Sequence, residues 1–146
     1  MNVEIRELQP GEEPLAAAAL LELRPRLGSE RALAARAAAQ RGGGYRIVAA
    51  FEPGAATAAA AAGFRIGENL AWGRFLYVDD LGTRAASRGR GHGAALMGWL
   101  LDRARAEGCA ELHLDSGVGP ERESAHRLYL CSRLRISSHH FSRELG

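Results

Sequence analysis

Apolar and polar residues alternate at the start of the chain, where Val3 to Leu8 has the two-residue period of a half-exposed strand. Two stretches with helical composition follow, Glu12 to Leu23 and Ser29 to Gln40, divided by Arg24-Pro25-Arg26. Ser29 is suited to cap the second of these helices, and the glycines at 42–44 end it. The first third of the chain therefore predicts one strand and two helices.

The middle of the chain predicts three strands. Tyr45 to Phe51 is the first, and Phe75 to Leu81 gives the strongest strand pattern in the chain. Ala55 to Ala62 has the composition of a helix, but it lies between a turn and the strand-like Phe64 to Ile66. We assign it to a strand because pairing within a sheet overrides the weak preference of alanine for helices.

The last third predicts a long helix, a short strand, a second helix and one or two final strands, in the segments Gly91–Glu107, Glu111–Asp115, Pro120–Leu130 and Leu134–Leu145. An apolar stripe on the long helix is formed by Ala94, Met97, Leu101 and Ala104. The element order is therefore β-α-α-β-β-β-α-β-α-β. No linker or repeat interrupts it, so we expect a single α/β domain over residues 1–146.

Composition and charge exclude several classes of protein. With 146 residues the chain is long enough for one well-packed domain, and no apolar run reaches the length of a membrane span. All 19 basic residues are arginines, which excludes Schiff-base chemistry and a lysine-dependent phosphate loop. The net charge of +2 is too small to indicate nucleic-acid binding by itself. The N-terminus lacks the apolar region of a signal peptide, so we expect a cytoplasmic protein.

A glycine- and arginine-rich loop between the strongest strand and the long helix is the clearest chemical feature. It runs Arg88-Gly89-Arg90-Gly91-His92-Gly93. A helix N-terminus offers unpaired N–H groups and a partial positive charge, and glycines let an anion approach the backbone closely. The spacing differs from the dinucleotide fingerprint G-x-G-x-x-G. The loop alone is compatible with a plain turn or with a diphosphate site.

This loop resembles the hallmark of the GCN5-related N-acetyltransferases, Arg/Gln-x-x-Gly-x-Gly/Ala between a strand and a helix. Leu76 to Thr83 is similar to the family's fourth strand, and Asp115–Gly117 followed by Ala125–Tyr129 resembles its later strand and helix. The resemblance implies an α/β fold with a central mixed, mostly antiparallel sheet of six to seven strands. It also implies about four flanking helices, and a fourth and fifth strand that splay apart.

The resemblance further implies acetyl-coenzyme A as cosubstrate and no metal. The pantetheine arm would pair with backbone groups of Leu81, Gly82 and Thr83. The pyrophosphate would be held by the amides of Arg88, Gly89, Arg90, Gly91, His92, Gly93 and Ala94. Tyr129 occupies the position of the family's usual catalytic tyrosine, and its phenol, protonated at neutral pH, would act as general acid toward the departing thiolate.

A general base is less well marked in the sequence. Asp80 is one candidate, with Asp79 and Glu68 as others. Asp79 and Asp80 would project to opposite faces of a regular strand, so only one of them is expected to reach the cleft. Many relatives deprotonate the amine through water, which leaves open whether a dedicated base exists.

Two positions depart from the pattern of the family. Arg122 stands where many relatives have an asparagine that contacts the cofactor, and Arg133-Leu134 replaces a Gly-Phe pair that turns into the next strand. A turn with positive φ would be strained at Arg133, so we expect a different backbone there.

The sequence supports three readings of function. The first is an N-acetyltransferase that moves an acetyl group to a primary amine by direct attack through a tetrahedral intermediate. The second is a non-catalytic acyl-coenzyme A-binding regulatory module, and the third is a nucleic-acid-binding domain, which the near-neutral charge opposes. The acceptor, a small molecule or a peptide, and the acyl chain length stay open. No nucleic-acid or membrane partner is expected, and a homodimer is left open.

Overall fold

The computed structural model describes residues 2–146, which form two compact units, one ending at Leu114 and the other running from Asp115 to Gly146. The first unit contains β1 (Glu4–Glu7), α1 (Pro14–Leu23), α2 (Glu30–Gln40), β2 (Arg46–Phe51), β3 (Ala60–Asn69), β4 (Gly73–Thr83), α3 (His92–Ala106) and β5 (Glu111–Leu114). The second contains α4 (Glu123–Cys131), preceded by a 3-10 turn at Pro120–Arg122. Further 3-10 turns lie at Pro25–Leu27, Arg41–Gly43 and Ala85–Ser87.

The sheet has the strand order β1-β2-β3-β4-β5, with four strands antiparallel in sequence and β5 parallel to β4. It is mixed and mostly antiparallel, as expected, but it has five strands in the described residues instead of six to seven. The missing strands are those expected in the tail, Leu134 to Leu145, which contains no strand. Alternation marks a segment that can form a strand, but a strand exists only where a partner supplies its hydrogen bonds.

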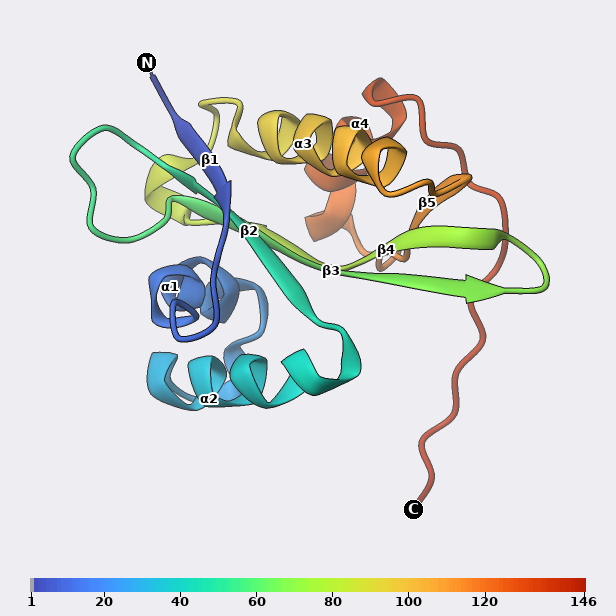
Figure 1. The fold of residues 1–146 in the computed structure, drawn as a ribbon, viewed down its shortest axis with the longest axis horizontal. Coiled ribbons are helices and arrows are strands. Elements are labelled where there is room, and N and C mark those ends of the chain that lie inside the picture. Colours follow the sequence, from blue (N-terminus) through green and yellow to red (C-terminus); the bar gives the residue numbers. More distant parts are fainter. Residues whose placement is uncertain (1) are drawn as a thin grey trace. The chain divides into compact units, whose positions relative to one another are not determined.

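Helices cover both faces of the sheet in the first unit. Figure 1 shows α1 and α2 on one side and α3 on the other. Ile47 and Ala49 of β2 belong to the core under α1 and α2, whereas Val48 and Ala50 belong to the core under α3. Because both faces are covered, β2 is apolar at nearly every position instead of alternating.

The local signals at helix ends are mostly confirmed. The hydroxyl of Ser29 accepts a hydrogen bond from the amide of Ala32 at 3.1 Å, which caps α2 as predicted. The stripe predicted on α3 is partly wrong, because Ala94 is exposed. The residues that α3 buries are His92, Leu96, Met97, Leu100 and Ala104. A polar residue begins this stripe, and hydropathy alone does not identify it as buried.

The fourth and fifth strands separate after a short paired region. Residues 75–78 of β4 pair with residues 111–114 of β5, and β4 then continues to Thr83 without β5 beside it. Asp79 to Thr83 therefore presents one backbone edge that β5 does not use, which confirms the expected splay. Within the described chain, no helix has the length and apolar character needed to span a membrane.

The second unit ends its helix with a left-handed residue. Arg133 has φ 65° and is the one non-glycine residue with positive φ among those described. The amide of Leu134 bonds to the carbonyl of Tyr129 at 3.0 Å and that of Arg133 to Leu130 at 3.0 Å, the pattern of a Schellman cap. The expectation of a different backbone at Arg133 was wrong, because two hydrogen bonds compensate the steric cost of the left-handed conformation.

Candidate active site

The loop between β4 and α3 carries a run of unpaired backbone amides. Gly89 and Gly91 have φ of 77° and 83°, in the region that favours glycine. A Cβ built on either would meet no heavy atom within 4 Å, so the space beside the loop is open. In the described residues, the amides from Gly89 to Ala94 make no hydrogen bond to a loop carbonyl or a side chain, and α3 lacks a side-chain cap. A diphosphate fits this set of donors.

The arginines of this loop differ in what their side chains do. Arg88 is exposed and has no ion pair among the described residues. Arg90 is paired with Glu52 at 2.8 Å, and the buried His92 Nε2 lies 2.8 Å from the same carboxylate. The hydrogen bond of His92 and that of Arg90 lower the pKa of Glu52 below its ordinary value. Glu52 therefore fixes the side chains of Arg90 and His92, and its carboxylate compensates the positive charge of Arg90.

The end of β4 leads directly into this loop. Leu81, Gly82 and Thr83 pair with Ala62, Ala61 and Ala60 of β3 on one side. Helix α1 packs closely at Gly82, because a Cβ there would lie 3.0 Å from the carbonyl oxygen of Ala19. The free edge of β4 at these residues can pair with an extended, amide-bearing chain, and this is the role that the resemblance assigned to them for the pantetheine arm.

An irregularity in β4 corrects one expectation about the two aspartates. Gly63 of β3 pairs with Asp80 whereas Phe64 pairs with Val78, so Asp79 is the extra residue of a β-bulge. Asp79 and Asp80 consequently line the same pocket instead of pointing to opposite faces. The expectation assumed an unbroken two-residue period, and a bulge resets that period by one residue.

Asp80 is anchored through both of its carboxylate oxygens. Arg24 Nε donates to Oδ1 at 2.8 Å and the hydroxyl of Tyr45 donates to Oδ2 at 2.7 Å. Burial and the Asp80 carboxylate raise the pKa of Tyr45 above its ordinary value, so the phenol stays a donor. Tyr45 reaches Asp80 by lying across Gly63, where a Cβ would overlap its ring. Each oxygen of Asp80 therefore already accepts one hydrogen bond, and a proton taken up by Asp80 would use a remaining lone pair.

Asp79 is held from one side only. Its Oδ2 accepts from Arg65 Nε at 2.8 Å, and its backbone carbonyl accepts from Arg24 at 3.0 Å. Its Oδ1 is buried and accepts no hydrogen bond in the described structure. A buried oxygen without a donor is costly, so this atom is the less constrained proton acceptor of the pair.

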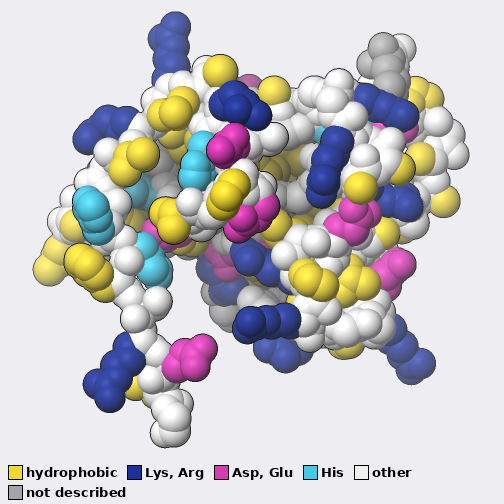
Figure 2. All heavy atoms as spheres, turned by 180° about the vertical axis from the view of Figure 1, so that it is seen from behind, with side chains coloured by type: hydrophobic (Ala, Val, Ile, Leu, Met, Phe, Trp, Pro, Cys, Tyr) yellow, Lys and Arg dark blue, Asp and Glu magenta, His cyan; other side chains and the backbone are white. Residues whose placement is uncertain are grey.

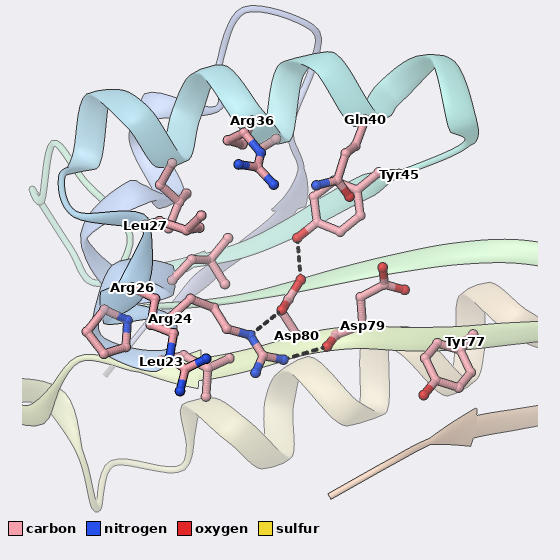
Figure 3. A pocket seen from close by; sticks show the side chains of 14 residues that line it. Leu23, Arg24, Arg26, Leu27, Arg36, Gln40, Tyr45, Tyr77, Asp79 and Asp80 are labelled. Carbon is pink, nitrogen blue, oxygen red and sulfur yellow. Dashed lines mark hydrogen bonds and ion pairs between the residues drawn. The ribbon is translucent and has the colours of Figure 1, made fainter. Parts of the chain in front are cut away.

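These residues form one side of a cavity of about 700 Å³, in the size range of small-molecule sites. Figure 3 shows the carboxylates of Asp79 and Asp80 on β4 directed toward the side of α2 and of the turn after α1, whereas the ring of Tyr77, which also lines the cavity, points the other way. Sequence reasoning missed Tyr45, Arg24 and Arg36 as pocket residues. The strand pattern of Tyr45 and the Arg24-Pro25-Arg26 break were visible, but nothing local shows that they meet around β4.

The other predicted residues lie elsewhere. Glu68 pairs with Arg74 near the hairpin end of β3, far along the strand from Thr83. Tyr129 lies on α4 in the second unit, where it is 8% exposed. In the same unit, Arg122 lies 3.4 Å from the hydroxyl of Ser116, and His126 lies 2.8 Å from the carbonyl of Gly117. Arg122 thus contacts its own loop.

A family model decides the identity of the fold. The model of the acetyltransferase (GNAT) family matches residues 7–131. The chain belongs to the GNAT family. One curated relative is the uncharacterized N-acetyltransferase YhdJ of Bacillus subtilis strain 168, which is 33% identical over 108 residues, covering 74% of this chain and 73% of that protein.

Solved structures agree with the GNAT fold. The ribosomal-protein-alanine N-acetyltransferase from Brucella melitensis biovar Abortus 2308 superposes with a TM-score of 0.83 at 20% identity, over 99% of this chain and 100% of that one. The aminoglycoside acetyltransferase HMB0005 from an uncultured soil metagenomic sample gives 0.80 at 20% identity, over 100% of both chains. At such identities the likeness concerns the fold. GNAT membership supports an acetyltransferase activity, with acetyl-coenzyme A as the family's cosubstrate.

The distribution of arginines on the surface and the placement of possible metal ligands concern the hypotheses of nucleic-acid binding and of a metal site. On the face in Figure 2, the described arginines are interspersed with acidic and apolar side chains and form no continuous basic band. Among residues 2–146, no three His, Cys, Asp or Glu side chains are placed to hold a metal ion.

Proposed function

We propose that the protein transfers the acetyl group of acetyl-coenzyme A to a primary amine of a small molecule or peptide, by direct attack through a tetrahedral intermediate. The observation that carries the proposal is the pairing of two features around β4. The uncapped amides at Gly89–Ala94 follow the C-terminal end of β4, and Asp79 and Asp80 on one face of β4 line the cavity. One feature suits a diphosphate and the other suits an amine.

Binding is assigned to the backbone of the loop and of the strand edge. The amides of Gly89 to Ala94 would hold the pyrophosphate, helped by the dipole of α3 and by the exposed side chain of Arg88, whose own amide donates to the carbonyl of Ala85 at 3.4 Å. The free edge at Leu81, Gly82 and Thr83 would pair with the pantetheine arm. These contacts would fix the thioester beside the face of β4 that carries the aspartates, and orientation of this kind lowers the barrier to attack.

Proton transfers are assigned to side chains. The attacking amine must lose a proton, and Asp80, or Asp79 through its unpaired Oδ1, is the proposed acceptor, directly or through water. Asp80 would accept it on a lone pair that Arg24 and Tyr45 leave unused. The leaving thiolate needs a proton, and Tyr129 is the proposed donor on the strength of its position in the GNAT motif. No covalent enzyme intermediate is required.

The test is release of coenzyme A thiol in the presence of a panel of primary amines, with mass spectrometry of the acetylated product. Tyr129→Phe should lower turnover by about 100-fold while leaving the dissociation constant of acetyl-coenzyme A nearly unchanged. Binding of acetyl-coenzyme A without turnover on any amine would favour the non-catalytic binding module. Equal turnover by Tyr129→Phe and wild type would remove Tyr129 from the mechanism.

A further inference from the structure

The charges around the cavity do not balance. Arg24 pairs with Asp80 and Arg65 pairs with Asp79, each at 2.8 Å, so both carboxylates are neutralised by the protein. Arg26 and Arg36 also line the cavity and make no ion pair or hydrogen bond within the described residues. Two exposed arginines therefore line the cavity without a protein anion beside them, although its most conspicuous side chains are acidic.

The unpaired charge at Arg36 lies across the cavity from the aspartates. In Figure 3, Arg36 extends from α2 into the space above Asp80, while the aspartates rise from β4. Leucines line the region between α2, α1 and the following turn: Leu20, Leu23, Leu27 and Leu33. A ligand that spans the cavity thus meets hydrogen-bond acceptors at one end, an apolar wall along its body and a free guanidinium at the other end.

We propose that the acceptor is an amine that also carries a carboxylate or a phosphate, joined to the amine by an apolar body. Arg36 binds the anionic group, with Arg26 adding positive potential, while the amine lies at Asp79 and Asp80. A guanidinium holds both carboxylate and phosphate through parallel N–H donors. This inference rests on the proposed acetyl transfer. It disfavours polycationic amines, because each extra positive charge would meet Arg26 and Arg36.

Direct binding tests the inference without turnover. The probes are phenylacetate, phenyl phosphate and the neutral phenylacetamide, titrated into wild type, Arg36→Ala and Arg31→Ala. Arg31 is exposed on the same helix and does not line the cavity, so its variant loses the same charge. Wild type should bind one of the anions at least about ten-fold more tightly than the amide, and only Arg36→Ala should lose this preference.

The outcomes distinguish a carboxylate from a phosphate on the acceptor. They also distinguish failure of the anionic-acceptor proposal from failure of the proposed acetyl transfer. Tighter binding of phenyl phosphate indicates a phosphorylated amine, and tighter binding of phenylacetate indicates a carboxylated one. Equal affinity for anion and amide, no anion binding by the folded protein, or the same loss in both variants would overturn the inference. A turnover arm compares 4-(aminomethyl)benzoate, whose amine and carboxylate lie at opposite ends of an aromatic ring, with benzylamine. Acetylation of benzylamine alone would leave the proposed transfer intact and contradict an anionic acceptor.

Discussion

The loop at Arg88–Ala94 and the cavity on β4 are built around the same strand, yet they offer ligands different kinds of groups. The loop presents backbone amides in a conformation that Gly89 and Gly91 make accessible. The cavity presents side chains, Asp79, Asp80 and Arg36, brought together from β4 and α2. Loop recognition therefore depends on main-chain geometry, and cavity recognition on which side chains the fold assembles.

This difference has a consequence for specificity. A main-chain site depends little on side-chain identity, so it suits a ligand shared by a whole family. A side-chain site changes its ligand with one or two substitutions, so it suits an acceptor that differs between relatives. Substitutions in the cavity should therefore alter acceptor use while acetyl-coenzyme A binding persists.

Tyr45→Phe is expected to give the largest difference between its effect on the cavity and its effect on the loop at Arg88–Ala94. Tyr45 is 5% exposed and donates to Asp80 at 2.7 Å. Loss of a hydrogen bond to a charged group should lower the free energy of unfolding by about 2 kcal/mol. The acceptor KM should rise, while the affinity for acetyl-coenzyme A stays the same. Urea unfolding, steady-state kinetics with an accepted amine, and calorimetry with acetyl-coenzyme A measure these three effects, and an equal loss at both sites would show that the regions are not separate.

Arg133→Gly provides a reference outside both regions. Arg133 has φ 65° in the cap after α4, and glycine adopts this conformation without the steric cost borne by a side chain. The variant should raise the free energy of unfolding by about 1 kcal/mol, seen as a higher Tm. Unchanged or lower stability would mean that the left-handed cap does not strain Arg133.

Arg88→Ala sharpens the claim that the loop binds through its backbone. The side chain is exposed and adds charge to a site that already has free amides. An exposed charge pair contributes at most about 1 kcal/mol, so the affinity for acetyl-coenzyme A should fall by less than about five-fold. A loss on the order of 100-fold would instead assign the binding to the side chain.

The smallest effect is expected from Glu52→Gln. The hydrogen bonds from His92 and Arg90 lower the pKa of Glu52 below its ordinary value. A carboxyl group whose pKa is lower in the folded protein than in the unfolded chain stabilises the fold at pH values above the unfolded pKa. This stabilisation is lost as the pH falls through the folded pKa. Wild type should exceed the variant in stability at neutral pH, and the difference should shrink on acidification and vanish once the pH is below the lowered pKa of Glu52.

Glu144→Gln in the exposed tail removes the same charge and is the control. Urea unfolding across this pH range should show no comparable dependence for it. A stability difference between wild type and Glu52→Gln that does not change with pH would contradict the role of Glu52 in fixing Arg90 and His92.

The elements with strong local patterns could be predicted from the sequence. Residues 30–40 end where Gly42–Gly44 follow, and residues 73–83 contain the strand that apolar alternation marked. The loop could be recognised because the spacing of its glycines and arginines resembles the hallmark of the GNAT family. Each of these features depends on neighbours in the sequence, and this is why local rules identified them.

The cavity could not be predicted in the same way. Its floor depends on a bulge at Asp79, which changes the register by one residue without any marker in the sequence. Its anchor, Tyr45, lies 35 positions from Asp80. The prediction of strands in the tail after Leu134 was wrong for a related reason. A strand forms only beside a partner strand, and the sequence of the tail does not show whether such a partner is present.

Calorimetric titration with acetyl-coenzyme A tests the central claim most directly, on wild type, Gly91→Glu and Gly98→Glu. Gly91 needs a left-handed φ of 83° at the entrance to α3, whereas Gly98 lies exposed on the same helix with open space around its Cα. The account predicts micromolar-range binding by wild type and Gly98→Glu, and a loss on the order of 100-fold in Gly91→Glu. No binding by folded wild type, or equal binding by all three, would contradict it.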